Sequence, residues 1–260
     1  MTRTALDIWP ALADALLLSW QDWGVTASDQ VTTPGSAQSL GRAEVALMID
    51  HTLLVPEATP EQVREICVEA GRFGVIAVCV SPNMLPLGTD WLAEGILTAC
   101  VVGFPSGAHH SAVKAAEAAQ ARANGADEVD MVINLGLAKS GAWGGVRAEI
   151  EAVREAAPHP AVLKVIIESG LLGDDEIVKA CEVAVAAGAD FVKTSTGFHA
   201  TASGSTVDSV RLMRATVGPD LGVKASGGIR SAEKALAMID AGANRIGTSS
   251  TEKILAGLPA

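Results

Sequence analysis

Short apolar runs rich in β-branched residues recur along the chain from about residue 44, and Ala- and Glu-rich stretches of helical character separate most of them. Alternating strands and helices predict a parallel sheet with right-handed crossover connections. We expect eight strands, at Val45–Ile49, Val75–Val80, Ile96–Val102, Glu128–Ile133, Val162–Ile167, Phe191–Lys193, Gly222–Lys224 and Arg245–Gly247.

Helix boundaries support this register. Thr59-Pro60-Glu61 provides an N-cap and a proline for a first helical turn, and Gln62 is placed to complete a capping box. A faint repeat puts a glycine after each of three predicted helices, in Asn124-Gly125-Ala126-Asp127, Ala187-Gly188-Ala189-Asp190 and Ala241-Gly242-Ala243-Asn244. Eight such units, with no GxGxxG fingerprint after the first strand, favour an α/β fold of the closed (β/α)8 TIM-barrel type over a doubly wound sheet.

The length of 260 residues suits one barrel of about 250 residues with an N-terminal extension. We expect residues 1–40 to form the extension and linker, and residues 41–260 to form the barrel catalytic domain. Within the extension, Ala11 to Trp20 is predicted as a short helix and Thr32 to Ser36 as a linker. Three of the five tryptophans fall in this segment, which favours docking on the domain or on another subunit.

Composition and charge narrow the class of protein. A net charge of −11 argues against nucleic acid or an anionic membrane as partner, since both need a basic surface. No signal peptide or membrane-spanning run is recognised, so we expect a cytoplasmic protein. The histidines and cysteines show no metal-ligand spacing, and we expect no metal site. Reduced, buried thiols are expected in the apolar runs, at Cys67, Cys79, Cys100 and Cys181.

Four charged residues interrupt four successive predicted strands. Asp130 alternates with apolar neighbours and is expected to point into the barrel, and Lys164, Lys193 and Lys224 occupy the next three strands. One buried lysine could simply pair with a carboxylate. A set of three lysines and one aspartate is harder to explain as structural pairing, because charges are almost never buried unless paired. The excess of cations must depress a lysine pKa or bind an anion.

A nucleophilic amine fits these residues. A free lysine has a pKa of about 10.4, and useful nucleophilicity near neutral pH needs about 7–8. That drop of about three units corresponds to roughly 4 kcal/mol, which a like charge about 4 Å away can supply at an effective dielectric near 20. Strands six and seven are neighbours, so we expect Lys193 to be the amine and Lys224 the charge that perturbs it.

Two glycine- and serine-rich loops suggest an anion site. Ser226-Gly227-Gly228-Ile229-Arg230 follows the seventh predicted strand, and Gly247-Thr248-Ser249-Ser250 follows the eighth. Either alone would be an ordinary turn or helix cap. Loops after strands seven and eight of a barrel are the usual phosphate site, where backbone N–H groups approach the anion because side chains are small or absent. Both together predict that the ligand carries a phosphate.

These segments resemble deoxyribose-phosphate aldolase from about Glu44 to about Ser250. The motifs that carry the resemblance are Asp50-His51-Thr52-Leu53-Leu54, Glu128-Val129-Asp130-Met131-Val132-Ile133-Asn134, Lys164-Val165-Ile166-Ile167-Glu168, Val192-Lys193-Thr194-Ser195-Thr196-Gly197-Phe198 and Val223-Lys224-Ala225-Ser226-Gly227-Gly228-Ile229-Arg230. The resemblance implies metal-independent, reversible cleavage of 2-deoxy-D-ribose 5-phosphate to D-glyceraldehyde 3-phosphate and acetaldehyde, with no cofactor. It also implies a homodimer.

The resemblance also implies residue roles. Lys193 would form the imine, Lys224 would lower its pKa, and Asp130 would move protons through a water with Lys164 as its ion-pair partner. The substrate- and phosphate-binding positions would be Asp50, Thr52, Cys79, Thr194, Gly197, Ser226, Gly227, Gly228, Gly247, Ser249 and Ser250. The chain departs from the family in two respects. It has no tyrosine, which some members use near the C-terminus, and Phe198 stands where some members carry a phosphate-binding lysine.

Three other functions remain open from the sequence. Another Schiff-base aldolase or a transaldolase would use similar chemistry on a different phosphorylated donor. A phosphate-binding barrel isomerase would use Asp130 for acid–base work without an imine. A non-catalytic sugar-phosphate binding protein would not need Lys193, Lys224 and Asp130 together in the lumen.

Overall fold

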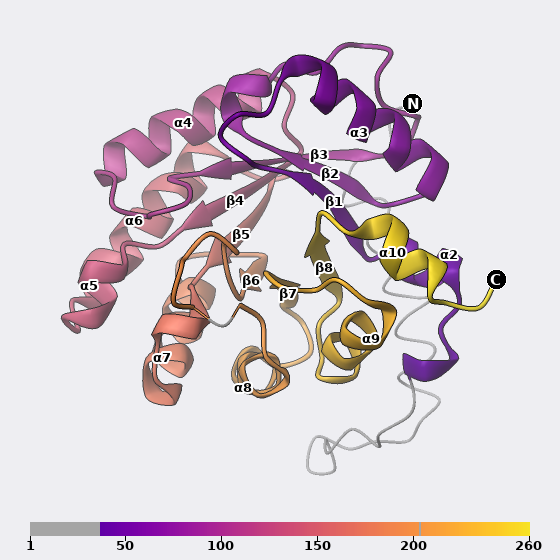
Figure 1. Ribbon diagram of the computed structural model, residues 1–260. Helices are drawn as coiled ribbons and strands as arrows, with labels where there is room; N and C mark the ends of the chain where they lie inside the picture. The colour runs from indigo at the N-terminus through magenta and orange to yellow at the C-terminus, as the bar shows by residue number, and fades with distance from the viewer. Residues whose placement is uncertain (1–36, 203) are drawn as a thin grey trace.

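The computed structural model describes residues 37–202 and 204–260, in which eight parallel strands close into a barrel in the order β1 to β8 (Figure 1). The closed barrel confirms the predicted fold class. The strands are β1 Ile49–Leu53, β2 Ala77–Val80, β3 Leu97–Val102, β4 Glu128–Val132, β5 Val162–Ile166, β6 Phe191–Lys193, β7 Gly222–Ser226 and β8 Arg245–Thr248.

Helices surround the barrel and connect its strands (Figure 1). The α-helices are α2 Arg42–Ala46, α3 Pro60–Phe73, α4 Ser111–Ala123, α5 Leu135–Lys139, α6 Trp143–Ala156, α7 Asp174–Ala186, α8 Val207–Val217, α9 Ala232–Asp240 and α10 Thr251–Ala256. Three short 3-10 turns join them, η1 Ala37–Ser39, η2 Pro82–Met84 and η3 Ser169–Leu171. None of the helices in the described ranges is long and apolar enough to cross a membrane.

The first predicted strand is wrong. Val45–Ile49 was expected to be a strand, but Arg42–Ala46 forms helix α2 and β1 begins only at Ile49. The Glu44 carboxylate accepts a hydrogen bond from the backbone N–H of Gly41 at 2.7 Å, which fixes the start of the helix. Val45 and Ala46 lie on its buried side. A short apolar run has the same hydrophobicity in either conformation, so its pattern alone could not distinguish helix from strand.

The strands separate two interiors. Val129, Met131, Leu163 and Val165 face outward and belong to the large core between barrel and helices. The intervening residues on β4 and β5 face the lumen, as the period of two along a strand requires. On the other side of the barrel, the lumen along β2 and β3 is apolar and contains Cys79, Ala99 and Val101, together with Leu54 just after β1, and Phe104 packs against them.

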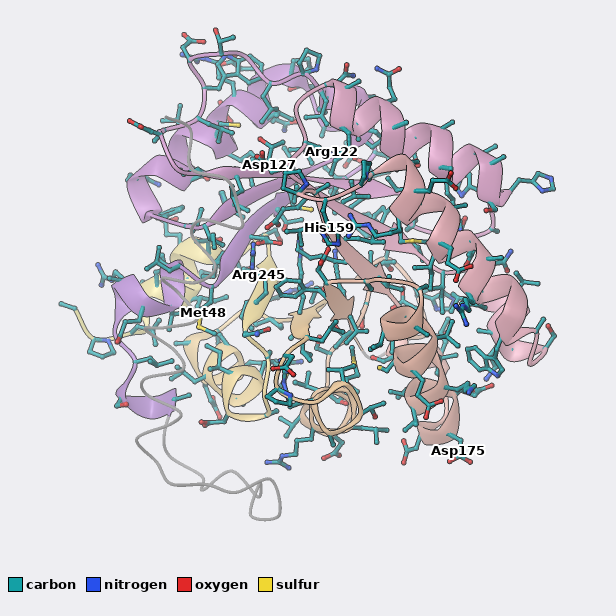
Figure 2. All side chains as sticks on the ribbon, turned by 180° about the vertical axis from the view of Figure 1, so that it is seen from behind. Met48, Arg122, Asp127, His159, Asp175 and Arg245 are labelled. Atoms are coloured by element: carbon teal, nitrogen blue, oxygen red, sulfur yellow. The ribbon has the colours of Figure 1, made fainter. Side chains whose placement is uncertain are left out.

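The faint repeat has a common structural role. The three glycines adopt positive φ after their helices, Gly125 at 91°, Gly188 at 82° and Gly242 at 106°. The polar residue two positions later accepts a hydrogen bond from a backbone N–H at the start of the preceding strand and so ties neighbouring strands together. The bonds are Asp127 to Thr98 at 2.9 Å, Asp190 to Leu163 at 2.7 Å and Asn244 to Val223 at 2.8 Å. Met48, Asp127 and His159, which shortly precede strands, are labelled in Figure 2.

The capping box predicted for α3 is present, since Thr59 and Gln62 exchange side-chain to backbone hydrogen bonds. At the N-terminal end of the described chain, Ala37 N donates to Asp240 Oδ1 at 2.8 Å and Arg42 N donates to Pro259 O at 2.9 Å. These contacts attach the segment before β1 to the end of α9 and to the C-terminal residues after α10. The predicted helix from Ala11 to Trp20 and the linker from Thr32 to Ser36 lie outside the described residues.

Candidate active site

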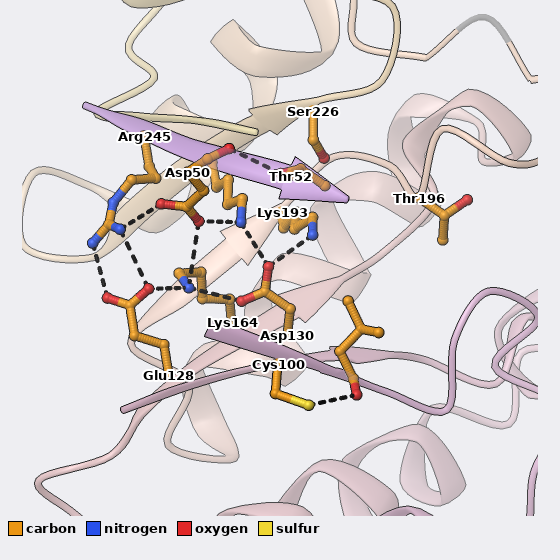
Figure 3. A network of polar contacts seen from close by, with 12 residues as sticks. Asp50, Thr52, Cys100, Glu128, Asp130, Lys164, Lys193, Thr196, Ser226 and Arg245 are labelled. Atoms are coloured by element: carbon orange, nitrogen blue, oxygen red, sulfur yellow. Dashed lines mark hydrogen bonds and ion pairs between the residues drawn. The ribbon is translucent and has the colours of Figure 1, made fainter. Parts of the chain in front are cut away.

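The four charged residues singled out in the strands meet inside the barrel (Figure 3). Asp130 on β4 is the register partner of Lys164 on β5, and Lys193 on β6 is the register partner of Lys224 on β7. Each lies on a lumen-facing position. Lys193 is 3% exposed and the other three are more deeply buried.

One carboxylate is surrounded by three ammonium groups. Asp130 Oδ1 accepts a hydrogen bond from Lys164 Nζ at 2.7 Å. Its other oxygen, Oδ2, accepts from Lys193 Nζ and from Lys224 Nζ, each at 2.7 Å. Asp130 is therefore the acceptor shared by all three lumen lysines, and it lies within hydrogen-bond distance of the expected nucleophile.

Three further charged residues complete the lumen. Asp50 on β1 accepts from Lys224 Nζ and, at 2.6 Å, from Arg245 on β8. Glu128 on β4 accepts from Arg245 Nη2 at 3.0 Å and from Lys164 Nζ at 2.5 Å. The lumen thus holds four cations and three carboxylates, rather than the three lysines and one aspartate expected from the strands. The excess of positive charge is one.

Sequence reasoning missed Glu128 and Arg245 as members of this site. The alternation that turns Asp130 inward also turns Glu128 inward, two residues earlier on the same strand. Arg245 opens β8 just after a glycine-containing turn, where a charged residue is usually solvated at a strand end. Barrel closure brings it beside Asp50 and Glu128, which are far away in the sequence.

The lumen charges push the lysine pKa values apart. Burial lowers the pKa of Lys193, and neighbouring Lys224 lowers it further, against the opposite effect of Asp130. Burial also disfavours charge on Lys164 and Lys224, but their carboxylate neighbours outweigh it and raise both pKa values. The pKa of Asp130 is held well below its usual range by the three lysines, despite burial. Among the three lumen lysines, Lys193 alone has a lowered pKa.

The remaining lumen wall is apolar. Cys79 lies in it, and burial raises the pKa of its thiol, which keeps the group neutral. At the mouth, Phe104 from the loop after β3 meets Phe198 from the loop after β6 edge to face, with ring centroids 5.2 Å apart. Phe198 is 42% exposed. The site therefore presents a charged wall on one side and an apolar wall on the other.

The glycine-rich loops also lie together. Gly197 and Gly227 have φ values of 80° and 88°, and a Cβ at either would come within 3.3 Å of the other's Cα, so both positions require glycine. Ser226 Oγ donates to Ser195 O at 2.5 Å, and Gly228 and Ser249 are exposed. Ser250 is half-buried and precedes α10. These loops follow β6, β7 and β8 at the barrel end where Lys193 stands.

Three residues with expected binding roles have evident structural ones. Thr194 Oγ1 contacts Ser205 Oγ at 2.6 Å and donates to Ser226 O at 3.1 Å, so it joins the β6 and β7 loops. Thr52 Oγ1 donates to the backbone oxygen of Asp50 at 2.8 Å. A Cβ at Gly247 would lie 3.0 Å from Lys224 Cε, so this glycine makes room for the lysine stem.

Buried polar atoms without partners mark the ends of β5 and β6. Within the described ranges these include Glu168 Oε1, Ser169 Oγ and Ser195 Oγ. Glu168 adopts a left-handed backbone conformation at φ 50°, and its Oε2 accepts from the Thr196 backbone N–H at 3.1 Å. Since buried polar groups are normally hydrogen-bonded, the free atoms indicate a place for water or a polar ligand. Sequence reasoning missed this cluster, because no pattern marks a left-handed glutamate.

The metal-ligand pattern is also absent from the described part of the chain. No group of three or more His, Cys, Asp or Glu side chains is arranged there to hold a metal ion. The mixed acidic and basic lumen instead pairs each carboxylate with lysine or arginine.

Comparison with known proteins agrees with this geometry. Residues 44–257 match the family model described as DeoC/LacD family aldolase. The deoxyribose-phosphate aldolase of Kocuria rhizophila is 63% identical over 217 residues, which are 84% of this chain and 98% of that protein. Among solved structures, the aldolase QR15 is 41% identical with a TM-score of 0.77, and the match covers 82% of this chain and 95% of that one. A tetrameric deoxyribose phosphate aldolase from Aeropyrum pernix is 36% identical with a TM-score of 0.76, covering 83% and 91% of the two chains. This chain belongs to the DeoC/LacD family of aldolases.

Proposed function

We propose that this aldolase cleaves 2-deoxy-D-ribose 5-phosphate reversibly into acetaldehyde and D-glyceraldehyde 3-phosphate through a Schiff base on Lys193. The observation that carries the proposal is the position of Lys193. Among the three lumen lysines, Lys193 is the one with a lowered pKa, and its Nζ lies 2.7 Å from Asp130 Oδ2. The names of the relatives support the choice of substrate.

Bond formation begins at Lys193. The unprotonated amine attacks the aldehyde carbon C1 of the open-chain sugar. The resulting carbinolamine takes up a proton and loses water to give a protonated imine, and that proton is released again when the final imine is hydrolysed. Removal of the proton on the C3 hydroxyl then lets the C2–C3 bond break. Its electron pair moves to the iminium nitrogen, which leaves a neutral enamine and releases glyceraldehyde 3-phosphate. Protonation of the enamine carbon and hydrolysis release acetaldehyde and restore Lys193.

Proton transfer is assigned to Asp130 acting through a water. Its Oδ2 is adjacent to both Lys193 and Lys224, so a proton can move between the reacting carbon and the lysines without bulk solvent. Lys164 holds the other oxygen of Asp130 and acts as its ion-pair partner. Lys224 stays charged because Asp50 and Asp130 surround it, and its charge favours the neutral form of Lys193.

The substrate phosphate is assigned to the loops after β6, β7 and β8. Gly197, Gly227 and Gly228 would offer backbone N–H groups, and Ser226, Ser249 and Ser250 would flank them. Ser195 follows β6 on the same loop as Gly197, and its buried hydroxyl has no partner, so it would suit a sugar hydroxyl. Asp50, Thr52 and Cys79 would line the part of the lumen that holds the rest of the substrate.

The proposal includes the absence of any cofactor, because the imine itself supplies the electron sink. It also includes a cytoplasmic location and a homodimer. Exhaustive treatment with a chelator should leave turnover unchanged, and solution mass should be twice that of the chain.

A product assay tests the activity directly. Incubation with deoxyribose 5-phosphate should release acetaldehyde and glyceraldehyde 3-phosphate in equal amounts, each followed by its own coupled dehydrogenase. Lys193→Met should release neither, while the exposed Lys179→Met should behave as wild type. Isomerisation of the sugar phosphate without release of a two-carbon product would favour the isomerase, and binding without conversion would favour a binding protein.

A further inference from the structure

Six charged lumen residues form a closed ring of alternating sign (Figure 3). Each member contacts an oppositely charged residue on either side. The ring runs from Asp130 to Lys164, Glu128, Arg245, Asp50, Lys224 and back to Asp130. Three carboxylates and three bases balance each other within it. Lys193 stands outside the ring and is attached to it only through Asp130 Oδ2, so it carries the unbalanced positive charge.

Two members of the ring have no place in the mechanism above. Glu128 and Arg245 are the first residues of β4 and β8, and Figure 3 shows them at the end of the network opposite Lys193. Arg245 Nη1 lies 2.6 Å from Asp50 Oδ1 and 3.3 Å from Glu128 Oε2. Both side chains are almost completely buried. A buried pair of this kind gives little net stability, because desolvation offsets its attraction, so stability alone does not explain the presence of Glu128 and Arg245 in the lumen.

We propose that Glu128 and Arg245 are positioning residues, which close the charge ring so that Lys193 is the single uncompensated cation of the lumen and therefore its nucleophile. This inference rests on the proposed Schiff-base function. Glu128 forms an ion pair with Lys164, and Arg245 forms an ion pair with Oδ1 of Asp50. Asp130 Oδ2 then accepts from Lys193 and Lys224, and Asp50 Oδ2 accepts from Lys224.

The change in lumen charge predicts the direction in which each substitution shifts the pKa of Lys193. Glu128→Gln removes one negative charge and raises the lumen excess from one to two, which should make Lys193 easier to deprotonate. Arg245→Met removes one positive charge and the excess, which should make Lys193 harder to deprotonate. The double variant restores the original count. The groups facing Lys193 from the other strands are Asp130, Lys224 and Cys79, with Asp50 and Lys164 behind them, and they are unchanged in all three variants.

The test is the pH dependence of the rate at which borohydride traps acetaldehyde on the protein, together with the acid limb of kcat/KM. The rate rises with pH as Lys193 loses its proton. We expect Glu128→Gln to move this rise to lower pH by about one unit, and Arg245→Met to move it to higher pH by about as much. The double variant should return close to wild type. Opposite shifts that cancel are not expected of residues with a merely structural role.

Glu149→Gln is the matched control. Glu149 is also a buried glutamate, 2.7 Å from Lys114 Nζ, but this pair belongs to α6 and α4 outside the lumen. Its variant should leave the pH profile unmoved. Glu128→Gln and Arg245→Met should shift the pH profile in opposite directions, so either variant decides the proposal if the other does not fold. Arg245→Lys keeps the positive charge, and its pH profile should match that of the wild type.

Unmoved profiles in folded Glu128→Gln and Arg245→Met, or shifts of the same sign, would overturn the inference. Such a result would leave the proposed function intact as long as the wild type is still trapped on Lys193. Absence of a wild-type adduct would instead count against the proposed function.

Discussion

Lys193 and Lys224 are register partners on neighbouring strands, and their ammonium nitrogens both lie 2.7 Å from the same oxygen, Asp130 Oδ2. The pKa values of the two lysines nevertheless differ, since that of Lys193 is lowered and that of Lys224 is raised. Asp50 gives Lys224 a second carboxylate, whereas Asp130 is the one carboxylate paired with Lys193 among the described residues. One lysine is thus kept as a permanent cation and the other can serve as an amine.

Replacing the permanent cation should therefore slow the reaction at neutral pH. Lys224→Met removes the charge that lowers the pKa of Lys193, so less amine is free to attack. We expect kcat/KM at pH 7 to fall by at least about tenfold, with partial recovery as the pH is raised. Stopped assays across the pH range measure this, with Lys179→Met as the surface control. A rate loss that is constant with pH would exclude the electrostatic role.

Asp130 should be needed for proton transfer more than for imine formation. In Asp130→Asn the shared acceptor can no longer take up a proton, so protonation of the enamine carbon should slow by about 10²-fold or more. Exchange of the acetaldehyde methyl protons in D₂O reports this step. We expect exchange to be lost while borohydride still traps an adduct. Normal exchange in a folded Asp130→Asn variant would assign the proton to another group.

Phe198 should reduce the dependence on substrate phosphate. Its ring lies at the mouth against Phe104 and offers no charge to an anion. Phe198→Lys should raise kcat/KM for deoxyribose 5-phosphate relative to free deoxyribose by about tenfold, which corresponds to about 1.4 kcal/mol. Val113→Lys, at an exposed apolar position on α4, controls for added surface charge. Equal ratios in the wild type and Phe198→Lys would remove this role.

The lumen carboxylates should make stability depend on pH. Arg245, Lys224 and Lys164 hold the pKa of Asp50 below its ordinary value of 3.8, although burial alone would raise it. The contribution of Asp50 is therefore fully present above pH 4 and is lost as the pH falls below that value.

A comparison of variants isolates this contribution. The free energy of unfolding of Asp50→Asn should lie about 3–5 kcal/mol below wild type at pH 7, because two buried cations lose a partner. The gap should narrow between pH 4 and pH 3 in urea titrations. Asp208→Asn is the control, since the Asp208 side chain is 98% exposed. A gap that stays constant with pH would contradict the lowered pKa.

The sequence was sufficient to predict the barrel, because strands and helices alternate along the chain. It was also sufficient for the four charged strand residues, because side chains alternate in direction along a strand. Asp130 sits between Val129 and Met131, and that spacing alone fixes its direction. Prediction failed where the pattern was ambiguous, as at Val45, whose apolar neighbours form a helix. It also failed where tertiary closure decides the partner. Arg245 meets Glu128 across the barrel, and no local pattern carries that information.

The most direct test of Schiff-base formation on Lys193 is borohydride trapping with deoxyribose 5-phosphate, followed by peptide mass mapping. Reduction converts the imine to a stable secondary amine, so the modified lysine can be identified. Lys224→Met should retain the adduct at high pH, and Lys193→Met should lose it. Schiff-base catalysis by Lys193 predicts a single adduct on that residue. An adduct on Lys164 or Lys224 instead, or none while active protein turns over the sugar phosphate, would contradict it.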